Sequence, residues 1–134
     1  AGGDEINMIK FNNLPLTKKN YGWPLASYGA HYGKTLAISK SHKEKGFIEP
    51  LKYFVPSIGI SEITKVGKKS YVVASMANRA LWFFKLDAKN MITEIKRVSI
   101  KERIRDLKFK EKKLFLFLED SASIGIINLD KLLS

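Results

Sequence analysis

The sequence predicts an all-β fold of antiparallel strands, and three observations indicate that class. Short runs of β-branched, aromatic and aliphatic residues recur along the second half of the chain. The joins between these runs contain Gly, Asn, Asp or paired Lys residues, which favour turns. The sequence shows no heptads and no long stretch of helical period, and one group of strand-like runs is repeated later in the chain.

The strand-like runs of the second half are each about five to eight residues long, the usual length of strands in globular proteins. Their apolar positions are nearly continuous, so we expect these strands to be buried on both faces. The runs cover residues 70–75, 80–86, 92–100, 104–109, 114–118 and 123–129.

An internal repeat groups these runs. The segment from Ile63 to Asp87 and the segment from Leu107 to Asp130 match by residue class, at an interval of about 44 residues. Each predicts a strand, a Lys-Lys turn, an apolar strand, a polar turn and a strand that ends in Leu-Asp. A period of about 40–50 residues with four short strands is typical of a β-propeller blade. An ordinary β-meander with similar hairpins is the alternative.

The first half of the chain lacks this regularity. Residues 4–11 predict a strand, and a strand resumes at residues 51–54 before a Pro-Ser turn. Between them the sequence is rich in Gly, Ser and Lys and has little periodicity. Loops longer than about 12–15 residues in compact domains are usually functional or disordered. We therefore expect a strand and a long loop over residues 1–57, then one blade over residues 58–100 and another over residues 101–134.

The composition narrows the class of protein. The chain has 134 residues, 24 Lys and Arg against 13 Asp and Glu, a net charge of +11 and no Cys. This length predicts one domain. The lack of Cys excludes disulfides and thiolate metal sites, and no apolar run reaches the roughly 18–20 residues that span a bilayer. The Lys residues come in small groups, several of them at predicted turns, without a helix-turn-helix or an aromatic-basic RNA motif. We therefore expect a solvated basic surface; binding to nucleic acid or to anionic lipid is the alternative.

Several short motifs follow one another along the chain. They are Gly-Gly-Asp-Glu-Ile-Asn at residues 2–7, Asn-Tyr-Gly-Trp-Pro at 20–24, Tyr-Gly-Ala-His-Tyr at 28–32, Glu-Pro at 49–50 followed by Pro-Ser-Ile-Gly-Ile-Ser at 56–61, and Arg-Ile-Arg-Asp at 103–106. In this collinear order they resemble the second half of the soluble glucose/sorbosone dehydrogenases, which are aldose sugar dehydrogenases that depend on pyrroloquinoline quinone (PQQ). Each motif alone is weak, but Asn-Tyr-Gly-Trp-Pro within reach of Gly-Asp-Glu-Ile-Asn is specific.

The resemblance implies a six-bladed β-propeller, of which this chain would be a partial propeller of about two four-stranded antiparallel blades plus a long loop. It also implies oxidation of the C1 hydroxyl of an aldose sugar to a lactone, with PQQ and calcium as cofactors, in a periplasmic or secreted protein. The family's catalytic histidine belongs to the other half, so we expect no catalytic residue here and no activity from this segment alone. Its exposed blade edges would be covered by the remainder of the propeller or by further copies of the chain.

The matching motif positions imply a set of candidate site residues. Glu5 and the backbone carbonyl of Tyr21 fall on the family's structural calcium position, and calcium prefers such oxygen ligands. Tyr32, Arg103 and Arg105 fall on positions that contact PQQ, which carries three carboxylates. Arginines two apart on a strand share a face, and each guanidinium holds a carboxylate in a bidentate manner. The alternatives are a solvated carboxylate at Glu5, packing under the loop at Tyr32, and a surface salt-bridge strand for the arginine pair.

One position departs from the family pattern. Where the family usually has a lysine that approaches the cofactor, this sequence has Ala77, and Arg79 is displaced from that position by two residues. The departure favours a second hypothesis, a non-catalytic β-propeller module that serves only in binding. We also expect Asp4 to cap a turn, and His42, in a lysine-rich loop, to be solvated.

Overall fold

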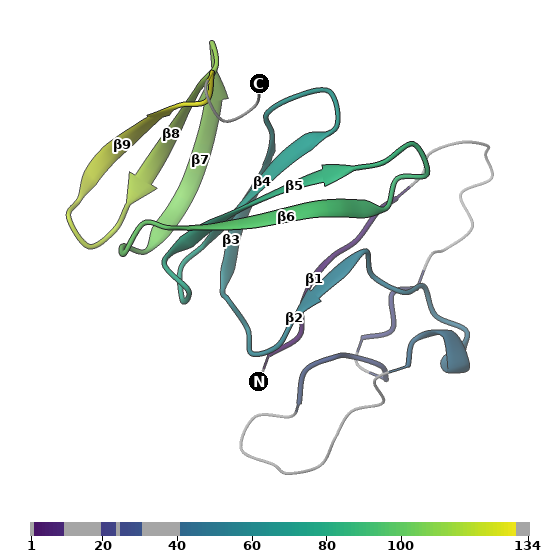
Figure 1. Cartoon of the computed structure of the whole chain (residues 1–134). Helices are drawn as coiled ribbons and strands as arrows, with labels where there is room; N and C mark the ends of the chain where they lie inside the picture. Colours follow the sequence, from purple (N-terminus) through teal and green to yellow (C-terminus); the bar gives the residue numbers. More distant parts are fainter. Residues whose placement is uncertain (1, 10–19, 24, 31–40, 131–134) are drawn as a thin grey trace. The chain divides into compact units, whose positions relative to one another are not determined.

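The computed structural model describes residues 2–9, 20–23, 25–30 and 41–130. Within these residues the chain forms nine β-strands and one short 3-10 helix, and it divides into two compact units (Figure 1). The N-terminal unit is Ala1–Ile58 and the C-terminal unit is Gly59–Ser134. The predicted all-β class is confirmed. No helix in the described part of the chain has the length and apolar character needed to cross a membrane.

The N-terminal unit is built on one antiparallel pair of strands. β1 (Asp4–Ile6) pairs with β2 (Lys52–Phe54), and the long connection between them contains the single helical turn η1 (Lys43–Lys45). Residues 7–9 lie outside the ladder, so the strand predicted over residues 4–11 is shorter than expected. The remainder of that predicted strand lies outside the described residues.

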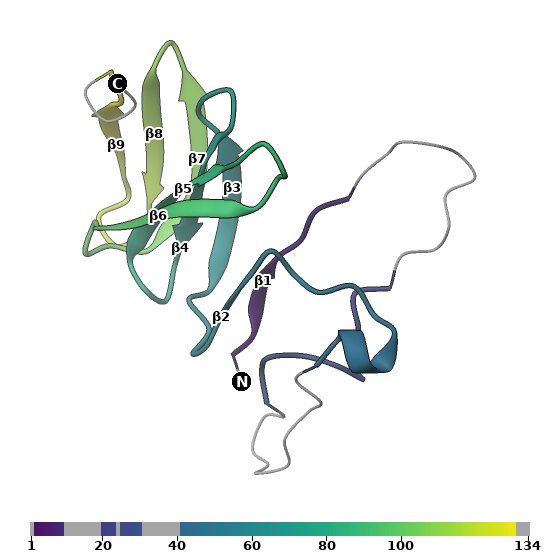
Figure 2. The same ribbon diagram turned by 45° about the vertical axis from the view of Figure 1, so that its right-hand side comes forward.

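The first sheet of the C-terminal unit has four antiparallel strands in chain order (Figure 2). They are β3 (Ile60–Lys65), β4 (Ser70–Ser75), β5 (Ala80–Leu86) and β6 (Ile92–Ser99). Residues 72–75 of the central strand β4 are all buried, which explains why its sequence is apolar without alternation. No residue of β6 is buried, so the expectation that these strands are buried on both faces is wrong for β6. The strand-like runs of the sequence therefore lie where strands are observed.

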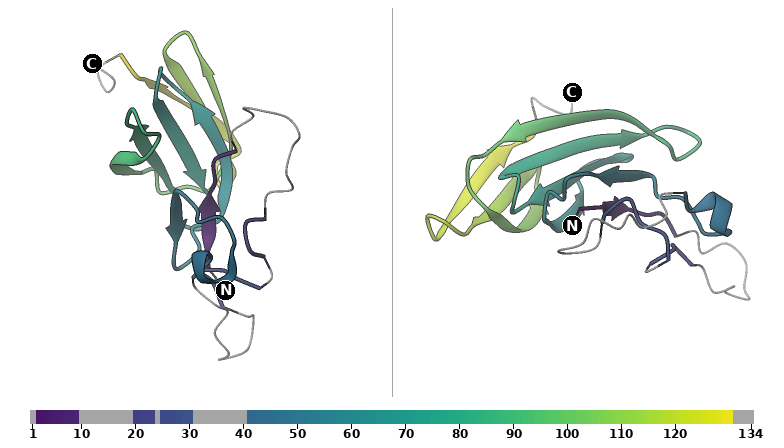
Figure 3. Two further views of the ribbon diagram at one scale, coloured as in Figure 1. Left: turned by 90° about the vertical axis from the view of Figure 1, so that its right-hand side faces the viewer. Right: turned by 90° about the horizontal axis from the view of Figure 1, so that it is seen from below.

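The second sheet of the C-terminal unit has three antiparallel strands, and the right view of Figure 3 separates it, in yellow and light green, from the first sheet. The strands are β7 (Ile104–Lys110), β8 (Lys113–Leu118) and β9 (Ser123–Asn128). The expectation of four strands in each sheet is therefore not met among the described residues. After β9 the described chain continues only to Asp130, which is too short for a fourth strand.

The internal repeat has a structural counterpart. β3, β4 and β5 correspond in order and in antiparallel pairing to β7, β8 and β9. The register of the first hairpin shifts between Ile60 and Glu62, and that of the second shifts between Ile104 and Asp106. Each repeat therefore has a β-bulge at the same place, where one extra residue is inserted and the strand bends. The repeat is one of backbone structure as well as of composition.

The core of the C-terminal unit is shared by its two sheets and the segments that follow their strands. Side chains two apart on a strand point to the same face, so alternate residues of the central strands contribute to it. Its buried members are Val66, Val72, Ala74, Leu81, Ile104, Leu107, Leu114, Leu116 and Leu129. A hydrogen bond from the Ser61 hydroxyl to the Ile104 carbonyl, at 2.6 Å, joins the two sheets at their bulges.

Candidate functional site

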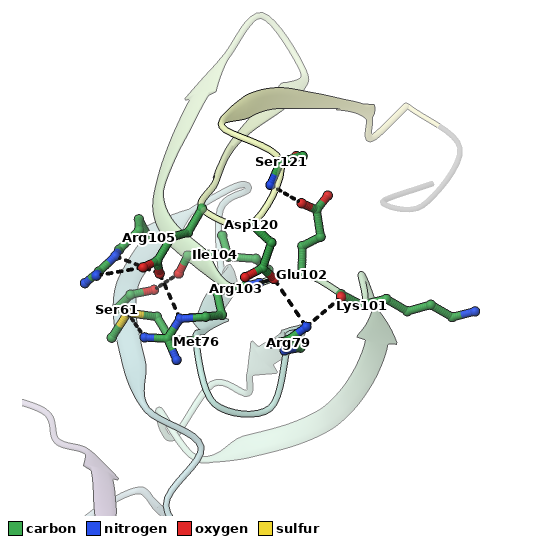
Figure 4. A network of polar contacts seen from close by, with 11 residues as sticks. Ser61, Met76, Arg79, Lys101, Glu102, Arg103, Ile104, Arg105, Asp120 and Ser121 are labelled. Atoms are coloured by element: carbon green, nitrogen blue, oxygen red, sulfur yellow. Dashed lines mark hydrogen bonds and ion pairs between the residues drawn. The ribbon is translucent and has the colours of Figure 1, made fainter.

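Two arginines at the start of β7 approach one carboxylate. Arg103 directly precedes β7, and Arg105 is the extra residue of the bulge between Ile104 and Asp106. The Nε atom of Arg103 lies 2.8 Å from Oε2 of Glu119, and the Nε atom of Arg105 lies 3.0 Å from the same oxygen. The Nη2 atom of Arg105 donates to Oε1 of Glu119 at 3.1 Å. The structure thus brings the predicted pair together (Figure 4), through a bulge rather than through one face of a regular strand.

The backbone around the arginine pair is fixed by a second acidic residue, Asp120. Its Oδ2 atom accepts the backbone N–H of Arg103 at 3.1 Å and lies 3.2 Å from Nη1 of Arg79 (Figure 4). The same Nη1 atom of Arg79 donates to the Lys101 carbonyl at 3.4 Å. The backbone N–H of Glu119 donates to the Arg103 carbonyl at 2.9 Å. Both the backbone N–H and the backbone carbonyl of Arg103 are therefore hydrogen-bonded.

Opposite charges in this group stabilise one another's ionised forms. Hydrogen bonds from Arg103 and then Arg105 hold the pKa of Glu119 below its ordinary value. The hydrogen bond to Glu119 likewise raises the pKa of Arg103. The side chains of Arg103, Arg105 and Glu119 are 37%, 56% and 35% exposed, so water screens the ion pairs and a ligand has access to them. Each guanidinium has five N–H donors, and the pair therefore retains donors for further carboxylates.

A second cluster of polar side chains surrounds His42 in the N-terminal unit. The His42 side chain is 0% exposed, so the expectation that it is solvated is wrong. Its Nε2 atom lies 3.4 Å from Oε1 of Glu5, and its Nδ1 atom lies 3.7 Å from Oε2 of Glu49. The Oε1 atom of Glu49 accepts the backbone N–H groups of His42 at 2.9 Å and Lys43 at 3.0 Å. These two bonds fold the lysine-rich segment back so that the histidine is enclosed.

Tyr28 completes this cluster. Its hydroxyl donates to Oε2 of Glu49 at 2.6 Å, and its ring stacks on Tyr53 with centroids 3.7 Å apart and planes 4° from parallel. The Tyr28 ring also lies 5.1 Å from the His42 ring, with 23° between their planes. The hydrogen bond to Glu49 is the main reason that the pKa of Tyr28 is raised to about 12. The same bond is the main reason that the pKa of Glu49 lies below its ordinary value.

The Tyr28–Glu49 bond predicts how the stability of the N-terminal unit depends on pH. Because the folded pKa of Tyr28 is raised, its contribution is complete below the ordinary value of 10.0 and is lost as pH rises to about 12. Because the folded pKa of Glu49 is lowered, its contribution is present above 4.5 and is lost as pH falls. We expect Glu49→Gln to lower the Tyr28 pKa toward 10.0, as measured by ultraviolet absorbance of tyrosinate. An unchanged titration in this variant would contradict the assignment, and Glu44→Gln, an exposed glutamate of η1, is the control.

The two residues predicted to bind calcium both lie in the N-terminal unit. Glu5 is on β1, and its Oε2 atom accepts a hydrogen bond from Nδ2 of Asn7 at 3.3 Å. The hydroxyl of Tyr21 donates to the Met8 carbonyl at 2.9 Å. In the described part of the chain, no group of three or more His, Cys, Asp and Glu side chains is placed to hold a metal ion. The expected site has one carboxylate and backbone carbonyls, so it stays a prediction. Tyr32 lies outside the described residues.

Three sequence motifs of the N-terminal unit contact one another. Gly3 lies against Gly29, and the Asp4 carboxylate binds the Pro-Ser turn. Gly3 has a φ of 85°, and a Cβ atom at this position would collide with the backbone nitrogen of Gly29. Asp4 caps the Pro-Ser turn: its Oδ1 accepts from the Ser57 hydroxyl at 2.7 Å, and its Oδ2 accepts the Ile58 N–H at 3.0 Å. Motifs that lie far apart in the sequence are therefore in direct contact.

The residues of these clusters that sequence reasoning missed include His42, Glu49 and Glu119. A signal existed for Glu119, because the Lys-Lys turn after β7 fixes which residues of the β7–β8 hairpin are opposite one another. Counting back from that turn without interruption pairs Arg103 with Asp120, and the bulge at Arg105 shifts the pairing by one residue, so that Glu119 lies beside Arg103, as their backbone hydrogen bond shows. No comparable signal exists for His42 and Glu49, which meet through an irregular loop.

Comparison with known proteins matches residues 1–128 to the family described as Glucose / Sorbosone dehydrogenase. The chain is 26% identical over 114 residues to the uncharacterized protein slr1608 of Synechocystis sp., a match that covers 80% of this chain and 26% of that protein. It is 39% identical over 61 residues to the aldose sugar dehydrogenase YliI of Escherichia coli, covering 45% of this chain and 15% of that protein.

Solved structures give the same result at the level of the fold. A crystal structure of glucose dehydrogenase is 29% identical, with a TM-score of 0.72, and the match covers 93% of this chain and 37% of that one. The apo form of the soluble aldose sugar dehydrogenase of Escherichia coli matches with a TM-score of 0.73 over 95% of this chain and 38% of that one, at 23% identity. The chain thus spans little more than a third of these structures. With a family match over almost its whole length, the chain belongs to the glucose/sorbosone dehydrogenase family.

Proposed function

We propose that this chain is part of a PQQ-dependent aldose sugar dehydrogenase in which Arg103 and Arg105 bind carboxylates of the quinone. The observation that carries the proposal is the convergence of two guanidinium groups on one carboxylate oxygen, at 2.8 and 3.0 Å, in a chain of this family. The proposed reaction is oxidation of the C1 hydroxyl of an aldose sugar to a lactone.

The donor chemistry of the arginine pair fits a carboxylated cofactor. A guanidinium binds a carboxylate through parallel N–H bonds, and here two guanidiniums already share one such group. PQQ, when bound, supplies the acceptor for the hydride of the sugar. The role of Arg103 and Arg105 is to bind and orient the anionic edge, while Asp120 holds the Arg103 backbone. The proposal assigns Tyr32 to a contact with the planar ring system.

The proposal extends to a calcium ion held by the carboxylate of Glu5 and the backbone carbonyl of Tyr21. Both groups are hard oxygen donors of the kind that calcium prefers. The Glu5 side chain is 16% exposed, so its carboxylate is partly shielded from competing water. The general base would lie in the part of the relatives that this chain does not match. The protein would be located in the periplasm or outside the cell. The chain alone is therefore expected to be inactive.

A titration with PQQ tests the proposal. We expect the chain to bind PQQ in the presence of calcium, and Arg103→Gln to weaken this binding roughly 10- to 100-fold, because charge-assisted hydrogen bonds to the ligand are lost. Arg97→Gln is the matched control, since it removes an exposed arginine of β6 that binds the side chain and carbonyl of Asn78 in the β4–β5 turn. Calorimetry measures both affinities. PQQ binding that is equally strong in both variants would contradict the proposed role of Arg103.

A non-catalytic binding module is the second candidate, and a specific observation favours it. Ala77 occupies the position of the family's lysine, and Arg79, which follows it closely, binds Asp120 and the Lys101 carbonyl instead. A folded chain that does not bind PQQ would support this candidate over the first.

The proposal also includes partners for the exposed surface of the C-terminal unit. Phe117 and Ile124 lie opposite each other in the β8–β9 register, and Ile126 lies two residues further along on the same face. These three side chains are 41%, 59% and 62% exposed. An apolar sheet face of this kind is suited to contact with another sheet. We propose that the remainder of the propeller packs on this face; further copies of this chain are the alternative.

A further inference from the structure

The carboxylate of Glu119 takes the best-placed donors of the arginine pair. The Nε atoms of Arg103 and Arg105 and the Nη2 atom of Arg105 lie 2.8 to 3.1 Å from its two oxygens. A ligand carboxylate bound between the two guanidiniums needs these same donors. It would also lie next to the negative charge of Glu119, which repels it. Glu119 and a bound anion therefore compete for one place.

We infer that Glu119 is an internal carboxylate that occupies the arginine pair until an anionic ligand displaces it, and that it makes the site selective for ligands with two or more carboxylates. The identity of the natural ligand, PQQ, rests on the proposed function. The displacement itself rests on the contacts of Glu119 within the C-terminal unit.

Glu119 is suited to leave the pair, whereas its neighbour Asp120 is suited to stay. Glu119 follows the last residue of β8, and its backbone N–H stays bonded to the Arg103 carbonyl whichever way the side chain turns. All three charged side chains are partly exposed, so rotation of the glutamate into water leaves no buried charge behind. Asp120 binds the Arg103 backbone and Arg79, which preserves the turn after Glu119 has moved (Figure 4).

Glu119 sets a minimum affinity that a free carboxylate ligand must exceed to bind the arginine pair. Because Glu119 belongs to the same chain, it competes at a high effective concentration. It also neutralises one of the two positive charges. A free monocarboxylate makes the same bonds as the Glu119 carboxylate but lacks its high effective concentration, and so it does not displace Glu119. A ligand with several carboxylates also reaches donors that Glu119 leaves vacant, such as Nη1 of Arg105, and so gains enough to compete.

The variant Glu119→Gln tests the inference, because it keeps the side-chain length and removes the charge. We expect the affinities for PQQ and for tricarballylate, a flexible tricarboxylate, to rise at least about tenfold. Binding of the monocarboxylate benzoate should become measurable. Calorimetry gives the affinities, and the Nε–H signals of Arg103 and Arg105 in nitrogen-15 NMR spectra report whether the ligand binds at this pair.

Glu102→Gln is the matched control. It removes the same charge from the same end of the unit, but the Glu102 carboxylate accepts the backbone N–H of Ser121 rather than binding an arginine. We expect this variant to leave the three affinities unchanged. If Glu119→Gln lowers the thermal stability, Glu119→Asp is the second variant, since its shorter side chain keeps the charge and should bind with intermediate affinity.

The outcomes separate the inference from the proposed function. Equal or weaker binding of all ligands by Glu119→Gln overturns the inference, because the carboxylate would then serve to orient the arginines. Tighter binding of tricarballylate with no binding of PQQ overturns the proposed function and supports the inference. Equal binding of PQQ by both proteins supports the function and overturns the inference. Folded proteins that bind none of the three ligands overturn both.

Discussion

Leu81→Ala is expected to lower the free energy of unfolding of the C-terminal unit by about 3–5 kcal/mol. Leu81 lies on the central strand β5, is 0% exposed and belongs to the core shared by the two sheets. Removing its branched end creates a cavity. β5 is hydrogen-bonded to β4 on one side and β6 on the other, so the backbone cannot close this cavity without breaking those hydrogen bonds. Urea unfolding followed by the fluorescence of the neighbouring Trp82 measures the loss.

The control for this prediction is Ile126→Ala. Ile126 is 62% exposed on β9, so the same kind of truncation removes little buried surface and should change the stability by less than about 1 kcal/mol. A similar loss in both variants would mean that the shared core is not the main source of stability in this unit. A small loss for Leu81→Ala would contradict its place at the centre of the core.

Gly3→Ala is expected to disrupt the N-terminal unit, with a loss of about 3 kcal/mol or more. The residue has a φ of 85°, which disfavours a side chain, and the new Cβ would collide with the backbone nitrogen of Gly29. A backbone atom cannot rotate away as a side chain does, so β1 must move. Hydrogen exchange at the Gly3 and Leu51 amides, which bond to the Phe54 and Ile6 carbonyls, measures the opening of the β1–β2 pair.

Gly46→Ala separates the two causes of this effect. Gly46 also has a positive φ, of 74°, but a Cβ atom there would meet nothing within 4 Å. It should therefore show only the conformational cost, of about 1 kcal/mol. Equal protection losses in both variants would show that the close approach of Gly3 and Gly29 contributes nothing.

The strands of the C-terminal unit could be predicted because each carries its own local signal. Runs such as residues 70–75 and 80–86 are apolar and β-branched, and turn residues mark their ends. The N-terminal unit has no such period, and its order comes from contacts between distant residues. His42 illustrates the difference: its neighbours in sequence indicate exposure, but Glu5 and Glu49 enclose it. Local composition alone does not contain that information.

The candidate site could be predicted in part. The resemblance identified Arg103 and Arg105, and the structure places them together as expected. The physical reason differs from the one expected, since a bulge and not the pleat of a regular strand directs Arg105. Glu119 belongs to a different strand end, so it becomes part of the site only once the hairpin register is known.

The apolar outer face of the β7–β9 sheet also affects how the chain behaves in concentrated solution. Phe117, Ile124 and Ile126 favour association of one copy with another, while the net charge of +11 keeps copies apart. That repulsion extends over about 10 Å at 0.1 M salt and only about 3 Å at 1 M. The positive charge thus keeps copies of the chain from associating through this apolar face. Salt screens the charge, so we expect the solubility of the chain to fall as ionic strength rises.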